Sequence, residues 1–196
     1  MDKAERTRNY IIETAAHIFN KKGYEGTSFS DIIESSGISK GAIYGHFENK
    51  DELALAALDH NLNLASKIIF SNVKDRADSC EKLIGFARSY SIFYEIISNA
   101  GGCPVINAAV DSDDGHSEVR KRVTKFITMW QNSIDKIIKE GIQKGELKFS
   151  PEAKIFSNIF ISLIQGGIML SKVMNDRKYI DEASDFLVSQ AEKMKA

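Results

Sequence analysis

Apolar residues recur every three to four positions along most of the 196-residue chain, which is the spacing of one face of an α-helix. In residues 3–22, Ile11, Ala15 and Ile18 fall on one side, and Gly23 is suited to end the helix. Further helical segments are expected over residues 50–73, 79–98, 117–144, 151–174 and 176–195, and residues 105–110 form a short apolar segment. Together with two short helices described next, the pattern predicts an all-α protein of about nine helices.

Residues 27–53 differ from these long segments, because two very short helices are expected there with a glycine turn between them. Ser28 and Asp31 have the capping-box spacing, in which a side-chain oxygen accepts from a first-turn amide. Gly37 can adopt the positive φ that a tight turn between crossing helices needs. Ser39 is a candidate N-cap for the second short helix, expected over residues 40–47.

The second short helix is expected to turn small and polar side chains outward. Ile43 and Phe47 stand four positions apart and are predicted to pack inward. The residues left on the exposed side are Lys40, Gly41, Ala42, Tyr44 and His46. A helix that presents such residues from its first turn suits a DNA major groove. A plain helical hairpin inside a larger bundle is the alternative, but packing alone does not require Lys40, Tyr44, His46 and Lys50 to face outward together.

The order of residues through this region carries a resemblance to a known family. The matching positions are Gly23-Tyr24, Thr27-Ser28, Asp31-Ile32, Gly37 to Gly41, Ile43-Tyr44, His46-Phe47, Lys50 and Leu53. This order resembles the DNA-binding domain of TetR/AcrR-type transcriptional regulators and runs without a gap. Ile33 departs from it, since such proteins more often have alanine where the helices cross.

The resemblance implies an all-helical homodimer that binds a palindromic double-stranded DNA operator, usually as a repressor. It implies a helix-turn-helix DNA-binding domain over residues 1–50, with the motif at about 27–47, and a helical effector-binding and dimerisation domain over 51–196. Matched residue by residue, the expected phosphate contacts are Thr27, Ser28, Tyr44, His46 and Lys50. The residues expected at base edges are Ser39, Lys40, Gly41 and Ala42, with Lys40 the best candidate for reading guanine.

The same resemblance implies a pocket for a small effector in the carboxy-terminal bundle. The side chains that the sequence offers as its lining are Phe86, Tyr90, Phe93, Tyr94, Cys103, Phe126, Met129, Trp130 and Phe160. An apolar lining predicts a hydrophobic or aromatic ligand, although plain core packing is the alternative for each aromatic residue. The segment around Cys103 also resembles one in which some of these regulators sense electrophiles or oxidants; a buried, unreactive thiol is the alternative.

The helix expected over residues 151–174 is apolar around more than half of its circumference, so it must be covered on two sides. A second copy of the chain is the simplest cover, and Gly166-Gly167 would permit close backbone approach. We therefore expect a four-helix dimer interface, two helices from each subunit, with complete burial in a monomer as the alternative. The interface residues expected are Phe156, Phe160, Leu163, Gly166, Gly167, Leu170, Phe186 and Leu187.

Charge adds nothing to the case for DNA binding. The chain has a formal net charge of −1. Residues 1–50 carry seven Lys or Arg and seven Asp or Glu. A basic face must therefore come from the segregation of Arg6, Arg8, Lys40 and Lys50 on one side.

Nothing in the sequence suggests an enzyme, a metal site or a cofactor. The four histidines share neither HExxH nor Cys/His ligand spacing, and no Ser/His/Asp set is suggested. The acidic run from Asp111 to Gly115 fails as a calcium loop, because its fifth position is glycine and its twelfth is Arg122. A turn that caps the next helix is expected there instead.

Two cysteines do not make a disulfide framework, and the chain has neither a signal-like start nor 18 uncharged apolar residues in a row. We therefore expect a cytoplasmic protein that does not span a membrane. A helical adaptor that binds another protein is the alternative function, and it would show no salt-dependent affinity for DNA.

Overall fold

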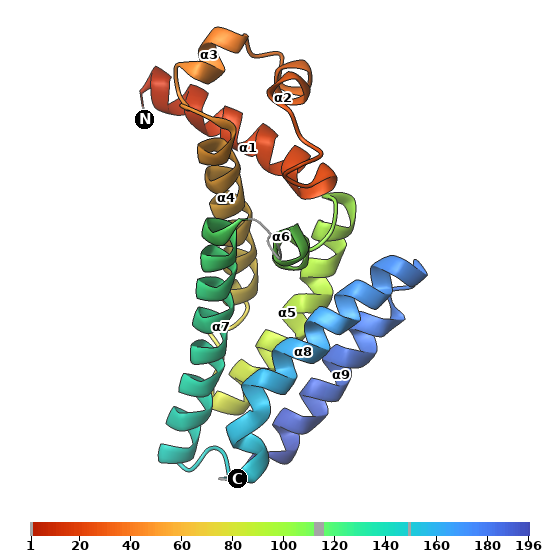
Figure 1. The fold of residues 1–196 in the computed structure, drawn as a ribbon. Helices are drawn as coiled ribbons and strands as arrows, with labels where there is room; N and C mark the ends of the chain where they lie inside the picture. The colour runs from red at the N-terminus through yellow and green to blue at the C-terminus, as the bar shows by residue number, and fades with distance from the viewer. Residues whose placement is uncertain (1, 112–115, 149) are drawn as a thin grey trace. The chain divides into compact units, whose positions relative to one another are not determined.

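The computed structural model describes residues 2–111, 116–148 and 150–196, and over these residues it confirms the all-α prediction. Figure 1 traces the helices in chain order. They are α1 (Lys3–Lys22), α2 (Phe29–Ser36), α3 (Lys40–Tyr44), α4 (Lys50–Ser71), α5 (Ser79–Asn99), α6 (Pro104–Asp111), α7 (Ser117–Gln143), α8 (Pro151–Met174) and α9 (Lys178–Lys193). The capping turn predicted after Asp111 falls on residues 112–115, outside the described ranges.

The chain divides into two compact units, which we call unit 1 and unit 2. Unit 1 comprises Met1–Leu64 and Asn99–Val123, and unit 2 comprises Ala65–Ser98 and Thr124–Ala196. Helices α4 and α7 each contribute residues to both units. The functional boundary expected after residue 50 lies inside unit 1 and stays a prediction.

The core of unit 1 forms where the apolar face of α1 meets α2, α3 and the start of α4. Ile11, Ile32, Ile43, Phe47 and Leu53 are completely or almost completely buried there. Helices as short as α2 and α3 are not stable alone, so α1 and α4 must hold them in place.

Helix α3 is shorter than the expected residues 40–47, because it ends at Tyr44. Gly45 follows, and the amide of His46 already bonds to the Ile43 carbonyl oxygen at 3.0 Å, three residues back as in a turn. Glycine is a poor helix former, which accounts for the early end. Helix α8 ends at Met174, where Asn175 takes a left-handed conformation with φ 50°, and α9 begins at Lys178, two residues later than expected.

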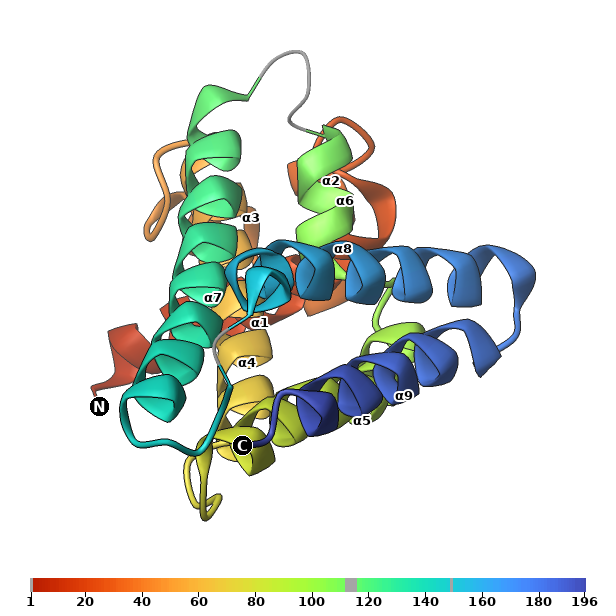
Figure 2. The same ribbon diagram turned by 90° about the horizontal axis from the view of Figure 1, so that it is seen from below.

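The core of unit 2 is a cluster of aromatic rings from α5, α7 and α8. Trp130 stacks on Tyr90 with ring centroids 4.7 Å apart, and Phe160 meets both rings edge-on at 6.1–6.3 Å. Helices α8 and α9 run side by side in both views (Figures 1 and 2). A Cβ at Gly167 would lie 3.0 Å from the Tyr179 carbonyl oxygen, so this glycine brings α8 close to α9 of the same chain.

Within the described residues, one segment of α8, Ile155–Met174, is long and apolar enough to cross a membrane by length and composition alone. One side of it is buried in unit 2, where Phe160 and Ile164 are inaccessible to solvent. The other side exposes Ile155, Ile159, Met169, Leu170, Val173 and Met174. The helix is therefore an element of the unit 2 core with an uncovered apolar side.

Candidate nucleic-acid interface

The connection from α2 to α3 has the geometry of a helix-turn-helix. Ser28 caps α2 by accepting from the Asp31 amide at 3.2 Å, and the Asp31 carboxylate accepts from the Ser28 amide at 2.8 Å. Gly37 ends α2 in the left-handed region with φ 66°. Ser39 then caps α3 by accepting from the Ala42 amide at 3.3 Å. Both caps and the glycine turn are those expected from the sequence.

Asp31 also forms an ion pair with Lys22 at the end of α1. Its hydrogen bonds to Lys22 and Ser28 hold the pKa of the carboxyl well below its usual range. The pair therefore links the first turn of α2 to the end of α1.

The outward side of α3 is open and carries the residues expected at base edges. Ser39, Lys40 and Gly41 are exposed, and Ala42 is half-buried. Nothing lies within 4 Å of where a Cβ would stand at Gly41. Lys40 Nζ lies 5.7 Å from the centroid of the Tyr44 ring, which itself packs edge-on against Phe29. The backbone on this side of α3 can therefore come close to a base edge, and the side carries one cation, Lys40.

Two of the expected phosphate contacts are engaged elsewhere in the described conformation. Thr27 is only 1% exposed, and its hydroxyl donates to the Gly23 carbonyl oxygen at 2.7 Å, so its side chain secures the α1–α2 connection from inside. Lys50 Nζ donates to the Tyr24 carbonyl oxygen at 3.0 Å and lies 3.9 Å from the Tyr24 ring centroid. Ser28 and Tyr44 are exposed, and His46 is half-buried.

Arg8 on α1 lies next to the end of α3. Its guanidinium is 4.8 Å from the Phe47 ring centroid and 3.9 Å from a Glu52 carboxylate oxygen. Glu52 in turn accepts from the Glu48 amide at 2.8 Å. Arg8 is thus paired with an acidic side chain, and the expected gathering of Arg6, Arg8, Lys40 and Lys50 on one side stays a prediction.

Tyr24 makes several contacts that the sequence did not indicate. Its hydroxyl donates to the Asp51 carboxylate, its amide donates to Asp111 Oδ2 at 3.2 Å, and its ring lies 4.1 Å from that of His116. Burial and the hydrogen bond to Asp51 raise the pKa of Tyr24 to about 12. Asp51 and Asp111 are 27 and 87 residues away, so no local pattern could have revealed these contacts.

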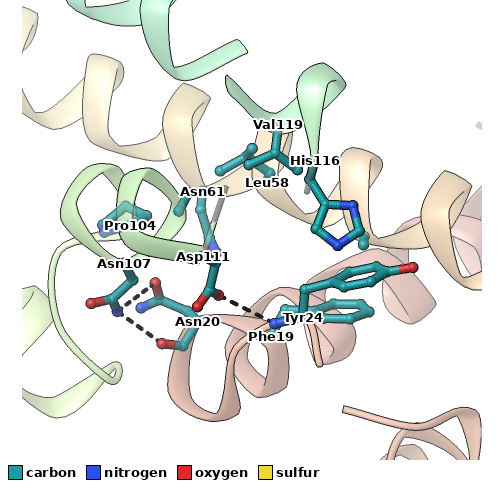
Figure 3. Close-up of a pocket in the computed structure, with 12 residues that line it drawn as sticks. Phe19, Asn20, Tyr24, Leu58, Asn61, Pro104, Asn107, Asp111, His116 and Val119 are labelled. Atoms are coloured by element: carbon teal, nitrogen blue, oxygen red, sulfur yellow. Dashed lines mark hydrogen bonds between the residues drawn. The ribbon is translucent and has the colours of Figure 1, made fainter. Parts of the chain in front are cut away.

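A cavity of about 490 Å³, open to solvent, lies beside Tyr24 within unit 1 (Figure 3). It is lined by Phe19, Asn20, Tyr24, Ala54, Leu58, Asn61, Pro104, Asn107, Ala108, Asp111, His116 and Val119. Asn107 on α6 donates to the Asn20 carbonyl oxygen on α1 at 2.9 Å, and Asn20 donates to the Gly102 carbonyl oxygen at 2.9 Å. These bonds fasten α6 to α1 at one side of the cavity.

The residues expected to line an effector pocket are divided between the two units. Phe86, Tyr90, Phe93, Phe126, Trp130 and Phe160 lie together in the unit 2 aromatic cluster. Tyr94 is half-buried and Met129 is exposed. Cys103 is buried and belongs to unit 1, so it is not part of that cluster.

The residues expected at a dimer interface divide between the two sides of α8 and α9. Leu170 and Phe186 are exposed, Leu163 is half-buried, and a Cβ at Gly166 would meet nothing within 4 Å. Phe156, Phe160 and Leu187 are buried inside unit 2, and Gly167 packs against α9. The close backbone approach expected between subunits at Gly167 is thus made within one chain.

Two family models and several known proteins match this chain. Residues 79–187 match the tetracyclin repressor-like, C-terminal domain, and residues 11–57 match the bacterial regulatory proteins, tetR family. A TetR transcriptional regulator from Chloroflexus aurantiacus J-10-FL has a TM-score of 0.94 at 30% identity, over 100% of this chain and 98% of that chain. A TetR-family regulator from Cytophaga hutchinsonii has a TM-score of 0.89 at 32% identity, with the same coverage of 100% and 98%. The HTH-type transcriptional repressor DhaR from Mycobacterium sp. (strain GP1) is 24% identical over 177 residues, 89% of this chain and 87% of that protein.

Proposed function

The chain belongs to the TetR family of DNA-binding transcriptional regulators, and we propose that it is a repressor that binds a palindromic operator as a homodimer and is released by a small effector. The open, capped helix α3 is the observation that carries the DNA-reading part of this proposal. A helix of five residues contacts only a few base pairs, which is too few for selective binding in a genome. Two copies related by a two-fold axis, with half-sites about one DNA turn apart, overcome this limit.

Each residue near α3 has a distinct expected role. Lys40 reads a guanine edge, with Ser39, Gly41 and Ala42 allowing close approach of the α3 backbone. Ser28, Tyr44 and His46 contact phosphates from the rim. Lys50 contacts a phosphate with the ammonium N–H groups that its bond to the Tyr24 carbonyl oxygen leaves over, since an ammonium has three donors.

The uncovered apolar side of α8, extended by Phe186 on α9, is the proposed dimer interface. Val173 is 74% exposed and Phe186 is 50% exposed, and both are costly to leave in water. A second copy of α8 and α9 would cover this side and complete a four-helix interface. Because a second copy would cover its exposed side, α8 can be this apolar without spanning a membrane, as expected for a cytoplasmic regulator.

The proposed effector site is the aromatic cluster of unit 2, and the effector is a small hydrophobic or aromatic molecule. Trp130 supports this choice, because it is 1% exposed and no described residue accepts from its buried indole N–H. A buried donor without an acceptor is costly, and a ligand carbonyl or hydroxyl oxygen would satisfy it. To release DNA, the effector must bind the DNA-incompetent conformation more tightly, since equal affinity shifts no equilibrium.

Selection of bound duplexes from a random pool tests the DNA-binding proposal. An inverted repeat is expected among the selected sequences. Lys40→Ala should relax the preference at one base position in each half-site, by about 1–3 kcal/mol. Lys50→Ala should weaken binding to all sequences alike and reduce the salt dependence.

Glu13→Gln is the matched control, because Glu13 is an exposed side chain on the same unit, on α1 and not on α3. If both lysine variants bound DNA like the wild type, the residue assignment would be wrong. If no duplex were retained at low salt, the adaptor function would be favoured instead.

A further inference from the structure

The unit 1 cavity beside Tyr24 is separate from the effector site proposed in unit 2. Its apolar walls come from Phe19, Ala54, Leu58, Pro104 and Val119. The empty space of about 490 Å³ between these walls includes volume that is open to solvent, so an occupant would be only partly enclosed. The apolar walls suit a compact molecule with one ring or a short aliphatic body.

The asparagine side chains around the cavity already donate from Nδ2 to backbone carbonyl oxygens. Asn61 Nδ2 donates to the Ala16 carbonyl oxygen at 3.0 Å, and Asn107 Nδ2 donates to the Asn20 carbonyl oxygen at 2.9 Å. Asn20 Nδ2 donates to the carbonyl oxygens of Ala100 and Gly102 at 2.7 and 2.9 Å. The side-chain oxygen atoms of Asn61, Asn107 and Asp111 can accept further hydrogen bonds, so an occupant with N–H donors is favoured.

The charged side chains around the cavity also favour an occupant with N–H donors. Asp111 lines the cavity, and an adjoining hollow that shares Tyr24, Ala54, His116 and Val119 is also lined by Asp51 and Glu118. Glu118 is neutralised by Lys121 and Arg122, and Asp51 accepts from the Tyr24 hydroxyl. Among its described contacts, Asp111 accepts only a neutral amide, from Tyr24 at 3.2 Å, and no described ion pair balances its negative charge.

The Asp111 carboxylate occupies space that a side chain at position 23 would fill. A Cβ at Gly23 would lie 3.0 Å from Asp111 Oδ2, and Gly23 has φ 75°, so a side chain there would be strained and crowded. Lys50 approaches Tyr24 without lining the cavity, and its ammonium is tied to the Tyr24 carbonyl oxygen. No lysine or arginine is among the described lining residues of either hollow.

From these observations we infer that the unit 1 cavity binds a small apolar molecule carrying a protonated amine. The amine donates to the Asp111 carboxylate and to neighbouring amide oxygens, and the apolar body packs on Phe19, Leu58 and Val119. A charge-assisted hydrogen bond of this kind is roughly twice as strong as a neutral one. The occupant touches Tyr24, which is also the residue that holds Lys50.

Three probes with the same ring and nearly the same length test the inference: 2-phenylethylamine, 2-phenylethanol and phenylacetate. Their heats of binding to the full-length chain are measured by calorimetry at pH 7 and low salt, without DNA. The amine is expected to bind about tenfold more tightly than phenylacetate, with the alcohol between them. The amine should also shift the side-chain amide NMR signals of Asn61 and Asn107.

Two variants assign the binding to this cavity. Asp111→Asn keeps the size and the acceptor for the Tyr24 amide, and should weaken amine binding about tenfold while leaving the alcohol unchanged. Ala108→Leu fills the cavity and should weaken all three probes. Glu13→Gln, the matched loss of one exposed carboxylate outside the cavity, should change none of them.

Three outcomes would overturn the inference: equal affinity for the three probes, an amine affinity that Asp111→Asn does not change, or no saturable binding of any probe. Circular dichroism confirms that each variant is folded. Because these measurements use no DNA, they remain informative even if the proposed operator binding fails.

Discussion

The two units of the chain use aromatic side chains in opposite ways. In unit 2, Tyr90, Trp130 and Phe160 pack ring against ring, and their contacts are mainly apolar. In unit 1, Tyr24 meets a carboxylate through its hydroxyl, an ammonium through its ring face, and the open cavity at its side. Aromatic spacing in a sequence therefore indicates burial, while the polar partners decide whether an aromatic residue belongs to a core or to a site.

We expect the largest loss of stability when a ring is removed from the aromatic cluster of unit 2. Phe160→Ala removes a ring that contacts Phe86, Tyr90, Trp130 and Phe156, and should lower the free energy of unfolding by about 3–5 kcal/mol. Urea denaturation followed by circular dichroism measures the loss. Ile92→Ala, an exposed apolar position on α5 in the same unit, should cost less than about 1 kcal/mol. Equal losses at the two positions would mean that the aromatic cluster is not a close-packed core.

A smaller effect is expected where Tyr24 meets Asp51. Tyr24→Phe keeps the ring beneath Lys50 and removes the hydroxyl, which should cost about 1 kcal/mol of unfolding free energy at pH 7. The same denaturation experiment measures it. A loss as large as that at Phe160 would show that the two units depend on their aromatic residues equally.

The same variant tests the ionisation of Tyr24. The pKa raised to about 12 means that folding favours the neutral phenol. The stability that this adds is complete below the ordinary tyrosine value of 10.0 and is lost as the pH rises toward 12. Absorbance at 295 nm should show one late-titrating phenol in the wild type that Tyr24→Phe removes. A difference centred near pH 10 would contradict the hydrogen bond to Asp51.

The smallest effect is expected at the exposed cap of α2. The lowered pKa of Asp31 means that its carboxylate stabilises the fold above its ordinary value of 3.8, and that this contribution is lost as the pH falls below it. Asp31→Asn should therefore lower the urea midpoint slightly at pH 7 and leave it unchanged in strong acid. A constant difference at all pH values would show that the ion pair with Lys22 contributes nothing.

The helix-turn-helix could be predicted closely because its signals are local. Ser28, Gly37 and Ser39 act on neighbours within four residues, and the structure places each cap and turn where the sequence indicated. The family resemblance rested on the same residues, and the match of residues 11–57 to the tetR family model confirms it.

The limits of prediction appear where distant residues meet. Thr27 was expected to face a phosphate, but packing of the α1–α2 connection turns its hydroxyl onto the Gly23 carbonyl oxygen. Periodicity marked Phe156, Phe160 and Leu187 as apolar, yet could not tell which side of α8 and α9 faces the core and which remains exposed. Cys103 was grouped with the aromatic residues by type, whereas the structure places it in unit 1.

The sequence by itself determined the helices, their caps, the DNA-reading motif and the family, because hydrogen bonds and apolar periodicity act over a few residues. That Tyr24 contacts Lys50, Asp51, Asp111 and His116, beside a cavity, follows from the folded structure alone. Those contacts are made by segments far apart in the chain, and their energy depends on burial and charge that exist only once the chain is folded.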